Sequence, residues 1–332
     1  MSAATAAETA QDLPTGTVAM IAAAELDPAL MRSLTAEFAR RGTVHAAQAE
    51  SFATPTGGIQ AVRWSVTLDD SDDDFGSQFL VSLLEDAAEQ LRDRQPSDNP
   101  EVTTTVLSVH HRPTGQMMLV MDVDSTLIDQ EVIDLLAAHA GKEAEVAEVT
   151  ERAMRGELDF SESLHARVAV LQDLPEQILH QTLQKVTPTE GAQHLLESFR
   201  RRGYPAFAVS GGFEQILQPL AEQLGLTGYR ANILELSDRK LTGKVTGQVV
   251  DRAVKREQLK HWALDSGVPV SNVVAVGDGA NDLDMLGAAG VGVAFCAKPA
   301  LAEQADLVIS HRNMQLISYA LGLTPHEVPA HR

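Results

Sequence analysis

The stretch MMLVMDVDST, residues 117–126, decides the fold of most of this chain. Five apolar residues, Met117–Met121, are followed at once by the acids Asp122 and Asp124. A short continuous apolar run is typical of a parallel strand that is covered on both faces. Open α/β sheets bind ligands beyond the carboxyl ends of their strands, so two carboxylates at this point predict a site that needs a compensating cation. Taken alone, these residues also suit a turn with helix-capping acids.

Further short apolar runs follow along the chain and alternate with amphipathic helical segments. We expect strands at Pro205–Val209, Val273–Val276, Gly292–Phe295 and Leu307–Ile309. This alternation predicts a doubly wound α/β fold around a parallel sheet. The helical stretch over about residues 131–200 is too long for a single crossover, so its part at about 134–195 is expected to form a helical cap over the strand ends. Ile233–Val250 alternates apolar and polar residues and is interpreted as a hairpin insertion.

The N-terminal part of the chain has a different pattern, in which a strand, a helix, two strands, a helix and a strand follow one another. Asp27 and Pro28 are typical of the N-cap and first position of a helix after the strand Thr17–Ala24. The order βαββαβ predicts an α+β ferredoxin-like unit. The expected division is a disordered tail at 1–15, this unit at 16–111, a linker at 112–116, the α/β domain with its cap at 117–320, and a tail at 321–332.

Composition and charge restrict the partners. The chain has 332 residues, 44% of them apolar, which is enough for two domains with cores of their own. Its net charge of −20 repels phosphate backbones and anionic lipid, so we expect neither nucleic acid nor membrane as a partner. The single cysteine, Cys296, excludes a disulfide within the chain and suits a reducing cytoplasm. The N-terminus lacks the basic start and apolar core of a signal peptide, and no apolar run is long enough to span a bilayer.

Two further motifs suit the binding of a phosphate group. Ser210-Gly211-Gly212 follows a predicted strand, where a hydroxyl and free backbone N–H groups at a helix N-terminus suit a phosphate oxygen. Lys255 lies in the first turn of a predicted helix, against the preference of the helix dipole, which points to a task such as holding a phosphoryl group. Taken singly, an ordinary βα turn and a solvated lysine explain these residues more simply.

The stretch GDGAND, residues 277–282, follows the predicted strand Val273–Val276. Its glycines permit a close approach of the backbone to a ligand, and Asp278 and Asp282 add oxygen ligands of the kind that Mg²⁺ prefers. Together the motifs supply three or four carboxylates, one lysine and one serine, which is the inventory of metal-assisted phosphoryl transfer. The sequence has no Walker lysine loop, GxGxxG fingerprint or GxSxG elbow.

In this order, DVDST, VSGG, the Lys255 helix and GDGAND resemble the haloacid dehalogenase (HAD) superfamily, and residues 117–310 are similar to its phosphoserine phosphatases. The element order of residues 16–111 is similar to that of ACT domains, which are often attached to enzymes of amino-acid metabolism. The resemblance implies a Mg²⁺-dependent phosphatase of serine biosynthesis that hydrolyses O-phospho-L-serine to L-serine and phosphate through an aspartyl-phosphate.

The resemblance also implies a role for each motif residue. Asp122 is expected to be the nucleophile and Asp124 the general acid and base. Mg²⁺ is expected to bind Asp122, the main-chain carbonyl of Asp124, and Asp278. Ser210, the Gly211 N–H and Lys255 are expected to hold the phosphoryl oxygens. Asn281, also counted as substrate-binding, and the supporting Asp282 are expected to position Lys255, the phosphate and metal-bound water.

In the cap, the resemblance assigns Glu131 to the substrate ammonium group and Arg167 to its carboxylate, with Met154 and Phe160 as an apolar lid. Considered one at a time, Glu131 suits a first helical turn, Arg167 suits solvent, and the other two suit a core. Together they complement a zwitterionic amino acid, which a phosphosugar would not require.

Two alternatives stay open. The chain is otherwise expected to be a related HAD phosphatase or phosphotransferase that acts on another small phosphomonoester, or an amino-acid sensor with an inactive phosphatase domain. ACT domains place a glycine between the first strand and first helix at the effector site, whereas this chain has Ala24–Pro28 without one. We therefore expect the N-terminal domain to form a homodimer rather than to bind serine.

Overall fold

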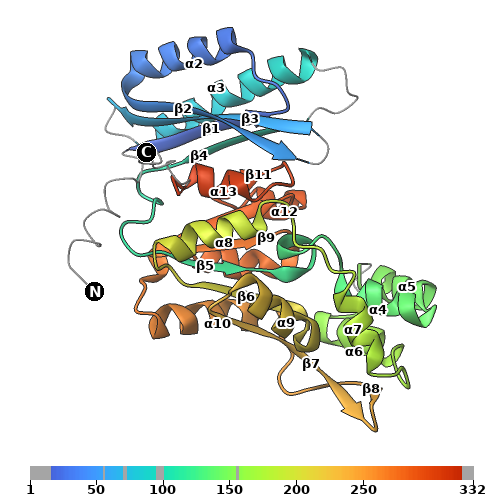
Figure 1. Ribbon diagram of the computed structural model, residues 1–332. Helices are drawn as coiled ribbons and strands as arrows, with labels where there is room; N and C mark the ends of the chain where they lie inside the picture. The colour runs from blue at the N-terminus through green and yellow to red at the C-terminus, as the bar shows by residue number, and fades with distance from the viewer. Residues whose placement is uncertain (1–15, 55–56, 70–72, 95–100, 155–156, 324–332) are drawn as a thin grey trace, which may run out of the picture.

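The computed structural model describes residues 16–54, 57–69, 73–94, 101–154 and 157–323. An N-terminal α+β unit is stacked on a larger α/β unit, from which a group of helices projects to one side (Figure 1). No helix among the described residues is long and apolar enough to cross a bilayer. Residues 1–15 of the predicted N-terminal tail lie outside the described part, whereas Leu321 and Leu323 of the predicted C-terminal tail are buried. These two leucines follow the last helix and complete its packing, so the folded chain extends beyond residue 320.

The larger unit is built on a seven-stranded sheet with the order β11-β10-β9-β5-β6-β7-β8. Six of its strands are parallel, and β8 pairs with β7 in the antiparallel sense. This sheet confirms the predicted α/β fold. The strands are β5 (Met118–Met121), β6 (Ala206–Phe213), β7 (Gly228–Ser237), β8 (Lys240–Thr246), β9 (Val273–Gly277), β10 (Val291–Phe295) and β11 (Leu307–Ile309).

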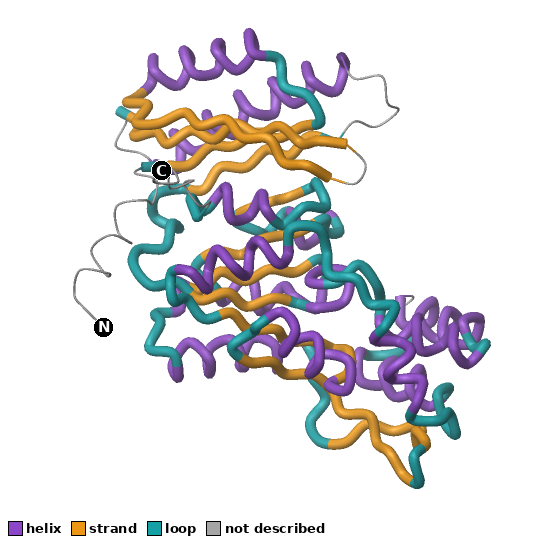
Figure 2. The backbone as a smooth tube through the Cα atoms, viewed as in Figure 1, coloured by secondary structure: helices purple, strands orange, loops and turns teal. Residues whose placement is uncertain are grey.

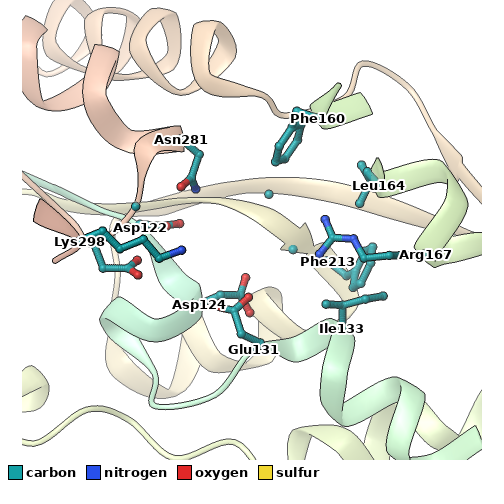
Figure 3. Close-up of a pocket in the computed structure, with 14 residues that line it drawn as sticks. Asp122, Asp124, Glu131, Ile133, Phe160, Leu164, Arg167, Phe213, Asn281 and Lys298 are labelled. Carbon is teal, nitrogen blue, oxygen red and sulfur yellow. The ribbon is translucent and has the colours of Figure 1, made fainter. Parts of the chain in front are cut away.

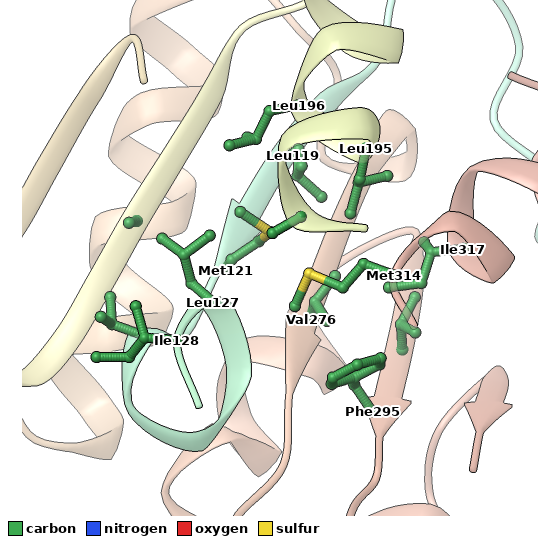
Figure 4. Close-up of a cluster of buried hydrophobic side chains, with 14 of the residues drawn as sticks. Leu119, Met121, Leu127, Ile128, Leu195, Leu196, Val276, Phe295, Met314 and Ile317 are labelled. Atoms are coloured by element: carbon green, nitrogen blue, oxygen red, sulfur yellow. The ribbon is translucent and has the colours of Figure 1, made fainter. Parts of the chain in front are cut away.

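Alternate side chains of β5 point to opposite faces of the sheet and bury against different helices. Met118 and Val120 belong to a hydrophobic cluster with α10 (Arg252–Asp265) and α11 (Leu283–Ala288). Leu119 and Met121 belong to a cluster with α8 (Ala192–Arg201), α9 (Glu214–Leu224) and α13 (Gln315–Ala320), part of which is drawn in Figure 4. Because both faces are covered, the first motif is held at the end of a strand that is completely buried.

A group of four helices lies between β5 and α8 and projects from the carboxyl edge of the sheet (Figure 2). We call this group the cap. The chain leaves the sheet through the short η1 (Val123–Leu127), and Ile128 faces Pro188 in an antiparallel bridge where the chain returns. The exact limits predicted for the domains and the cap stay predictions. The cap helices are α4 (Val132–Ala140), α5 (Glu143–Met154), α6 (Phe160–Ala169) and α7 (Gln177–Leu183).

The predicted hairpin at 233–250 is present, because β7 and β8 pair in the antiparallel sense with Ile233 opposite Thr246, but its first strand begins earlier than predicted. The first strand, β7, begins at Gly228, and its first residues pair in parallel with β6. Residues 228–232 read Gly-Tyr-Arg-Ala-Asn, which lacks the continuous apolar run that marked the other parallel strands. The far end of the hairpin reaches the cap, where Leu241 exchanges backbone hydrogen bonds with Asp173 and Leu174 at 2.9 Å each.

The N-terminal unit has the predicted βαββαβ order, with the strands arranged β2-β3-β1-β4. Asp27 caps α2 as expected, because its carboxylate accepts a hydrogen bond of 2.7 Å from the Ala29 N–H. The resemblance to ACT domains stays a prediction. The elements are β1 (Thr17–Ala23), α2 (Pro28–Arg41), β2 (Gly42–Thr54), β3 (Gly57–Leu68), α3 (Asp73–Arg94) and β4 (Val102–Leu107).

Strand β1 of the N-terminal sheet is covered on both faces. The helices of this unit cover Ala19 and Ile21 on one face, whereas Val18 and Met20 on the other face belong to the same hydrophobic cluster as α13. Tyr319 of α13 packs edge-on against Phe52 with a centroid distance of 5.6 Å. The two units therefore share one continuous core at β1, whereas most of strand β2 is exposed.

Next to this core, a polar contact fixes the N-terminal unit relative to the larger unit. The hydroxyl oxygen Oγ1 of Thr103 in β4 lies 2.9 Å from Nδ1 of His311 and accepts hydrogen bonds from the backbone N–H groups of Ser310 and His311 at 3.1 and 3.2 Å. Burial lowers the pKa of His311 to about 4, so the neutral ring can accept the threonine proton. Residues 310 and 311 are thus held by the N-terminal unit.

We predict that His311 makes the stability of the protein depend on pH. Its pKa lies at about 4 in the folded chain and 6.5 as the ordinary value, so the unfolded chain binds more protons between these values. Stability is complete above this window and falls as the pH drops through it, by up to about 3 kcal/mol. Urea unfolding at neutral pH and at about pH 5 should show a smaller pH effect in His311→Gln than in the wild type. The control His261→Gln, at an exposed histidine, should keep the wild-type slope; an unchanged slope in His311→Gln would contradict the assignment.

Candidate active site

A cavity of about 250 Å³ lies at the carboxyl ends of β5, β6 and β9, between the sheet and the cap helix α6 (Figure 3). Four carboxylates and two cationic side chains line it together with apolar side chains from the cap. The charged residues are Asp122, Asp124, Glu131, Asp278, Arg167 and Lys298. The chain order reverses on the two sides of β5, which is the point where open α/β sheets form ligand crevices.

A buried ion-pair network forms the floor of this cavity. The ammonium group of Lys255 lies 2.6 Å from Oδ1 of Asp122 and 2.8 Å from Oδ1 of Asp282. All three side chains are at most 5% exposed. Burial alone would lower the pKa of Lys255, but the two carboxylates outweigh burial and raise it. Lys255 is therefore a permanent cation, and its place in the first turn of α10 is explained by these two partners.

The network leaves an excess of negative charge. Burial raises the pKa of Asp122 well above its usual value, and the charge of Asp282 raises it further, against the effect of Lys255. Burial also raises the pKa of Asp278, again with a contribution from Asp282. Three aspartates thus share a single lysine, and a further cation would favour their ionised forms.

Carboxylate oxygens of Asp122, Asp278 and Asp282 lie within 4.8 Å of one another, so the residues from two separate loops can share one metal ion. Asp282 already accepts hydrogen bonds from Lys255 at 2.8 Å and from the Gly279 N–H at 3.2 Å, one on each oxygen. Thr126 donates to Asp278 at 3.1 Å and orients it. A set of hard oxygen donors with excess negative charge fits a divalent cation such as Mg²⁺.

Asp124 lies beside the network, on the side of the cavity that faces the cap. Its Oδ1 accepts a hydrogen bond of 2.8 Å from the Val132 N–H, and its Oδ2 accepts one of 3.0 Å from the Ser210 hydroxyl. Burial, followed by the charge of Glu131, raises the pKa of Asp124 to about 6. A carboxyl group with this pKa can both donate and accept a proton near neutral pH.

The Ser210-Gly211-Gly212 motif lies at the site, although its local structure differs from the prediction. Strand β6 continues through it to Phe213, and α9 begins only at Glu214, so no helix N-terminus lies directly at Ser210. The β6–β7 register is irregular between Val209 and Phe213. A side chain on Gly212 would meet Asp124 Oδ2 at 2.6 Å, so only glycine fits next to this acid.

Cap residues close the outer side of the cavity. Glu131 accepts a hydrogen bond of 2.6 Å from the Ser125 hydroxyl. Arg167 is partly buried on α6, and Figure 3 shows its guanidinium group extending toward the cavity on the side opposite Asp122. The ring of Phe160 covers Gly211, where an added Cβ would lie 2.9 Å from it. The lid prediction for Met154 concerns a side chain outside the described residues.

Asn281 also lines the cavity, from the short helix η3 (Ala280–Asp282). The structure adds Lys298, which the sequence analysis missed. Lys298 follows β10, lines the cavity and donates its backbone N–H to the carbonyl of Asp278 at 3.1 Å. A cation shortly after an expected parallel strand, at the edge where the other motifs end, was the signal that could have identified it.

Comparisons with known proteins agree with this geometry. Residues 117–290 match the haloacid dehalogenase-like hydrolase family. The chain is 51% identical over 230 residues to a phosphoserine phosphatase of Streptomyces coelicolor, a match that covers 69% of this chain and 56% of that protein. The chain thus spans about half the length of this relative. It is 48% identical to a phosphoserine phosphatase of Streptococcus thermophilus, over 59% of this chain and 92% of that protein.

A solved structure described as a phospho-aspartyl intermediate analogue of phosphoserine phosphatase is 42% identical to the chain. The two structures superpose with a TM-score of 0.59, over 62% of this chain and 99% of that one. The family match over residues 117–290 includes the cap and the four motifs. The chain therefore belongs to the haloacid dehalogenase-like hydrolase family.

Proposed function

We propose that the protein is a Mg²⁺-dependent phosphatase that hydrolyses O-phospho-L-serine to L-serine and phosphate, the last step of serine biosynthesis. The observation that carries this proposal is the convergence of Asp122, Asp278 and Lys255 next to Asp124, a carboxyl group whose pKa is raised to about 6. The relatives named above, two phosphoserine phosphatases and an intermediate analogue of one, support the same chemistry.

In the first step, a carboxylate oxygen of Asp122 attacks the phosphorus atom and the bond from phosphorus to the serine oxygen breaks. Asp124, in its protonated form, transfers its proton to the departing serine oxygen. With a pKa of about 6, roughly one Asp124 in ten is protonated at pH 7, which suffices for a general acid near its operating pH. The products of this step are serine and an aspartyl-phosphate on Asp122.

In the second step, Asp124 is ionised and takes a proton from a water molecule, whose oxygen attacks the phosphorus atom. The bond between phosphorus and Asp122 breaks, and phosphate leaves with the oxygen of that water. The hydrogen bonds from the Val132 N–H and Ser210 hold the Asp124 carboxylate in one place for both proton transfers. One side chain therefore acts on two different oxygens that occupy the same position in turn.

Mg²⁺ would be held by the carboxylates of Asp122 and Asp278 and by the main-chain carbonyl of Asp124, where it supplies positive charge that lets two anions approach. The phosphoryl oxygens would be bound by Ser210, the Gly211 N–H, Lys255 and Asn281. Asp282 uses its two oxygens on Lys255 and Gly279, so we assign it a supporting role.

The serine part of the substrate would be recognised by the cap. Glu131 would bind the ammonium group, and the guanidinium fork of Arg167 would bind the carboxylate. Both residues line the cavity. Phe160, at the start of the cap helix α6, covers Gly211 with its ring, where it would exclude water. Met154 is proposed to complete this lid.

We further propose that the protein is a cytoplasmic homodimer joined through its N-terminal unit. Strand β2 is an edge of the N-terminal sheet, is 13 residues long and carries no lysine or proline that would block pairing. Because β1 is covered on both faces, the exposed edge strand β2 or the helices are left for this contact. The single cysteine, Cys296, permits no disulfide within the chain, which suits a reducing compartment. Sedimentation equilibrium would test the dimer.

Asp122→Asn is expected to abolish turnover. The amide cannot form the aspartyl-phosphate, so Mg²⁺-dependent release of phosphate from phosphoserine should fall by roughly a thousandfold or more. Asp284→Asn, at an aspartate of α11 that pairs with Arg252, serves as a matched control and should retain activity. Substantial activity in Asp122→Asn would contradict the covalent mechanism, and comparable wild-type turnover of a phosphosugar would contradict the serine assignment.

Arg167→Ala is expected to weaken binding of phosphoserine selectively. Loss of a charged hydrogen-bonding group should raise KM for phosphoserine roughly 10- to 100-fold. KM for p-nitrophenyl phosphate, which has no carboxylate, should change little. Arg152→Ala, at an exposed arginine of the cap helix α5, is the control and should leave both values unchanged. Equal changes in KM for the two substrates in Arg167→Ala would show that Arg167 does not bind the substrate carboxylate.

A further inference from the structure

The cap is joined to the sheet by two chain segments, residues 125–130 and 187–190, which we call the hinge. Their backbones are bonded to each other: the Asp129 N–H donates to the Thr187 carbonyl and the Thr189 N–H to the Leu127 carbonyl, both at 3.0 Å. The Thr189 hydroxyl also donates to the Thr126 carbonyl at 2.6 Å. Any movement of the cap relative to Asp122 must pass through this pair of segments.

One arginine from a distant part of the sequence binds both segments of the hinge. Arg312 donates from Nε to the Asp129 carboxylate at 2.8 Å, from Nη1 to the Ser125 carbonyl at 3.1 Å and from Nη2 to the Ile128 carbonyl at 3.3 Å. Its Nη2 also lies 3.4 Å from the Thr189 hydroxyl. A planar guanidinium fork can span four such acceptors, which a lysine ammonium group cannot do.

Among the residues that Arg312 binds, Ser125 has the most direct effect on the site. Ser125 has a positive φ of 57°, a conformation that residues with a side chain rarely adopt. It lies next to Asp124, and its hydroxyl donates to Glu131 at 2.6 Å. Arg312 on the carbonyl and Glu131 on the hydroxyl thus fix Ser125 from two sides, and with it the spacing between Asp124 and Glu131.

Arg312 is itself fixed by its neighbours in the chain. His311 is bound to Thr103 of the N-terminal unit, and the Met314 N–H donates to the Glu190 carbonyl of the hinge at 2.8 Å. The guanidinium group lies over the ring of Phe295, 5.9 Å from its centroid. The segment 311–314 therefore connects the N-terminal unit, the hinge and the end of β10.

We propose that Arg312 is a positioning residue. It holds the hinge and Ser125, and thereby keeps Glu131 and Asp124 at the spacing at which both can contact the substrate. It does not line the cavity among the described residues and acts through the groups it binds. This inference rests on the proposed phosphoserine phosphatase function. It predicts that loss of Arg312 impairs reactions that need Glu131 more than reactions that do not.

The test compares Arg312→Ala with the wild type on two substrates. A small displacement of positioned groups should lower kcat/KM for phosphoserine roughly 10- to 100-fold. The value for p-nitrophenyl phosphate, which has no ammonium group for Glu131 and a good leaving group, should fall much less. Because Arg312 is 39% exposed, millimolar guanidinium ion should enter the vacated position and restore part of the phosphoserine activity, and ammonium ion should not. Arg201→Ala, at an exposed arginine of α8 paired with Glu197, should respond to neither ion.

A second readout does not depend on activity. Amide hydrogen exchange in residues 125–130 and 187–190 should be faster in Arg312→Ala, with no change in α10. If Arg312→Ala does not fold, Arg312→Lys keeps the charge without the fork and should lose activity on phosphoserine several-fold. Wild-type kinetics in these variants, or equal losses on both substrates without guanidinium rescue, would overturn the inference. A wild-type protein inactive on phosphoserine would instead contradict the proposed function.

Discussion

The contact between the buried ammonium group of Lys255 and the carboxylates of Asp122 and Asp282 is the constraint on which the site depends. A lone charge in this position would be strongly destabilising, and even a paired one is retained at a cost in desolvation. The network has more acids than bases once Asp278 is included, so it favours the binding of another cation. The same imbalance that is unfavourable for stability creates a place where a metal ion and a phosphate group can be bound together.

The fold supplies this constraint through strand geometry. Asp122, Ser210 and Asp278 belong to segments far apart in the sequence, and each comes at or near the carboxyl end of a parallel strand. Because β6, β5 and β9 are neighbours, their ends meet at one edge of the sheet. The cap then closes the site from the other side, and Arg312 ties its hinge to the sheet. The N-terminal unit shares its core with α13 and holds the neighbouring His311, so it supports the site although none of its described side chains lines the cavity.

Strong local signals predicted much of this arrangement. Continuous apolar runs such as Val273–Val276 identified buried strands, and acids directly after them identified the candidate site. The start of β7 was missed because the segment Gly228–Asn232 owes its strand conformation to pairing with β6 rather than to an apolar pattern. The continuation of β6 through Ser210 was also missed because Ser210-Gly211-Gly212 has no apolar pattern, whereas Lys298 carried a signal that was overlooked, a cation shortly after an expected strand. Arg312 could not have been identified from spacing, because its partners lie more than 120 residues away in the chain.

The central claim is that Asp122 receives the phosphoryl group while sharing a divalent cation with Asp278. A crystal structure of the protein with Mg²⁺ and beryllofluoride, a mimic of a phosphoryl group, tests this most directly. We expect a beryllium atom bonded to a carboxylate oxygen of Asp122 and a magnesium ion in contact with both aspartates. Beryllium bonded to another side chain, or a metal ion that does not contact Asp122 and Asp278 together, would contradict it.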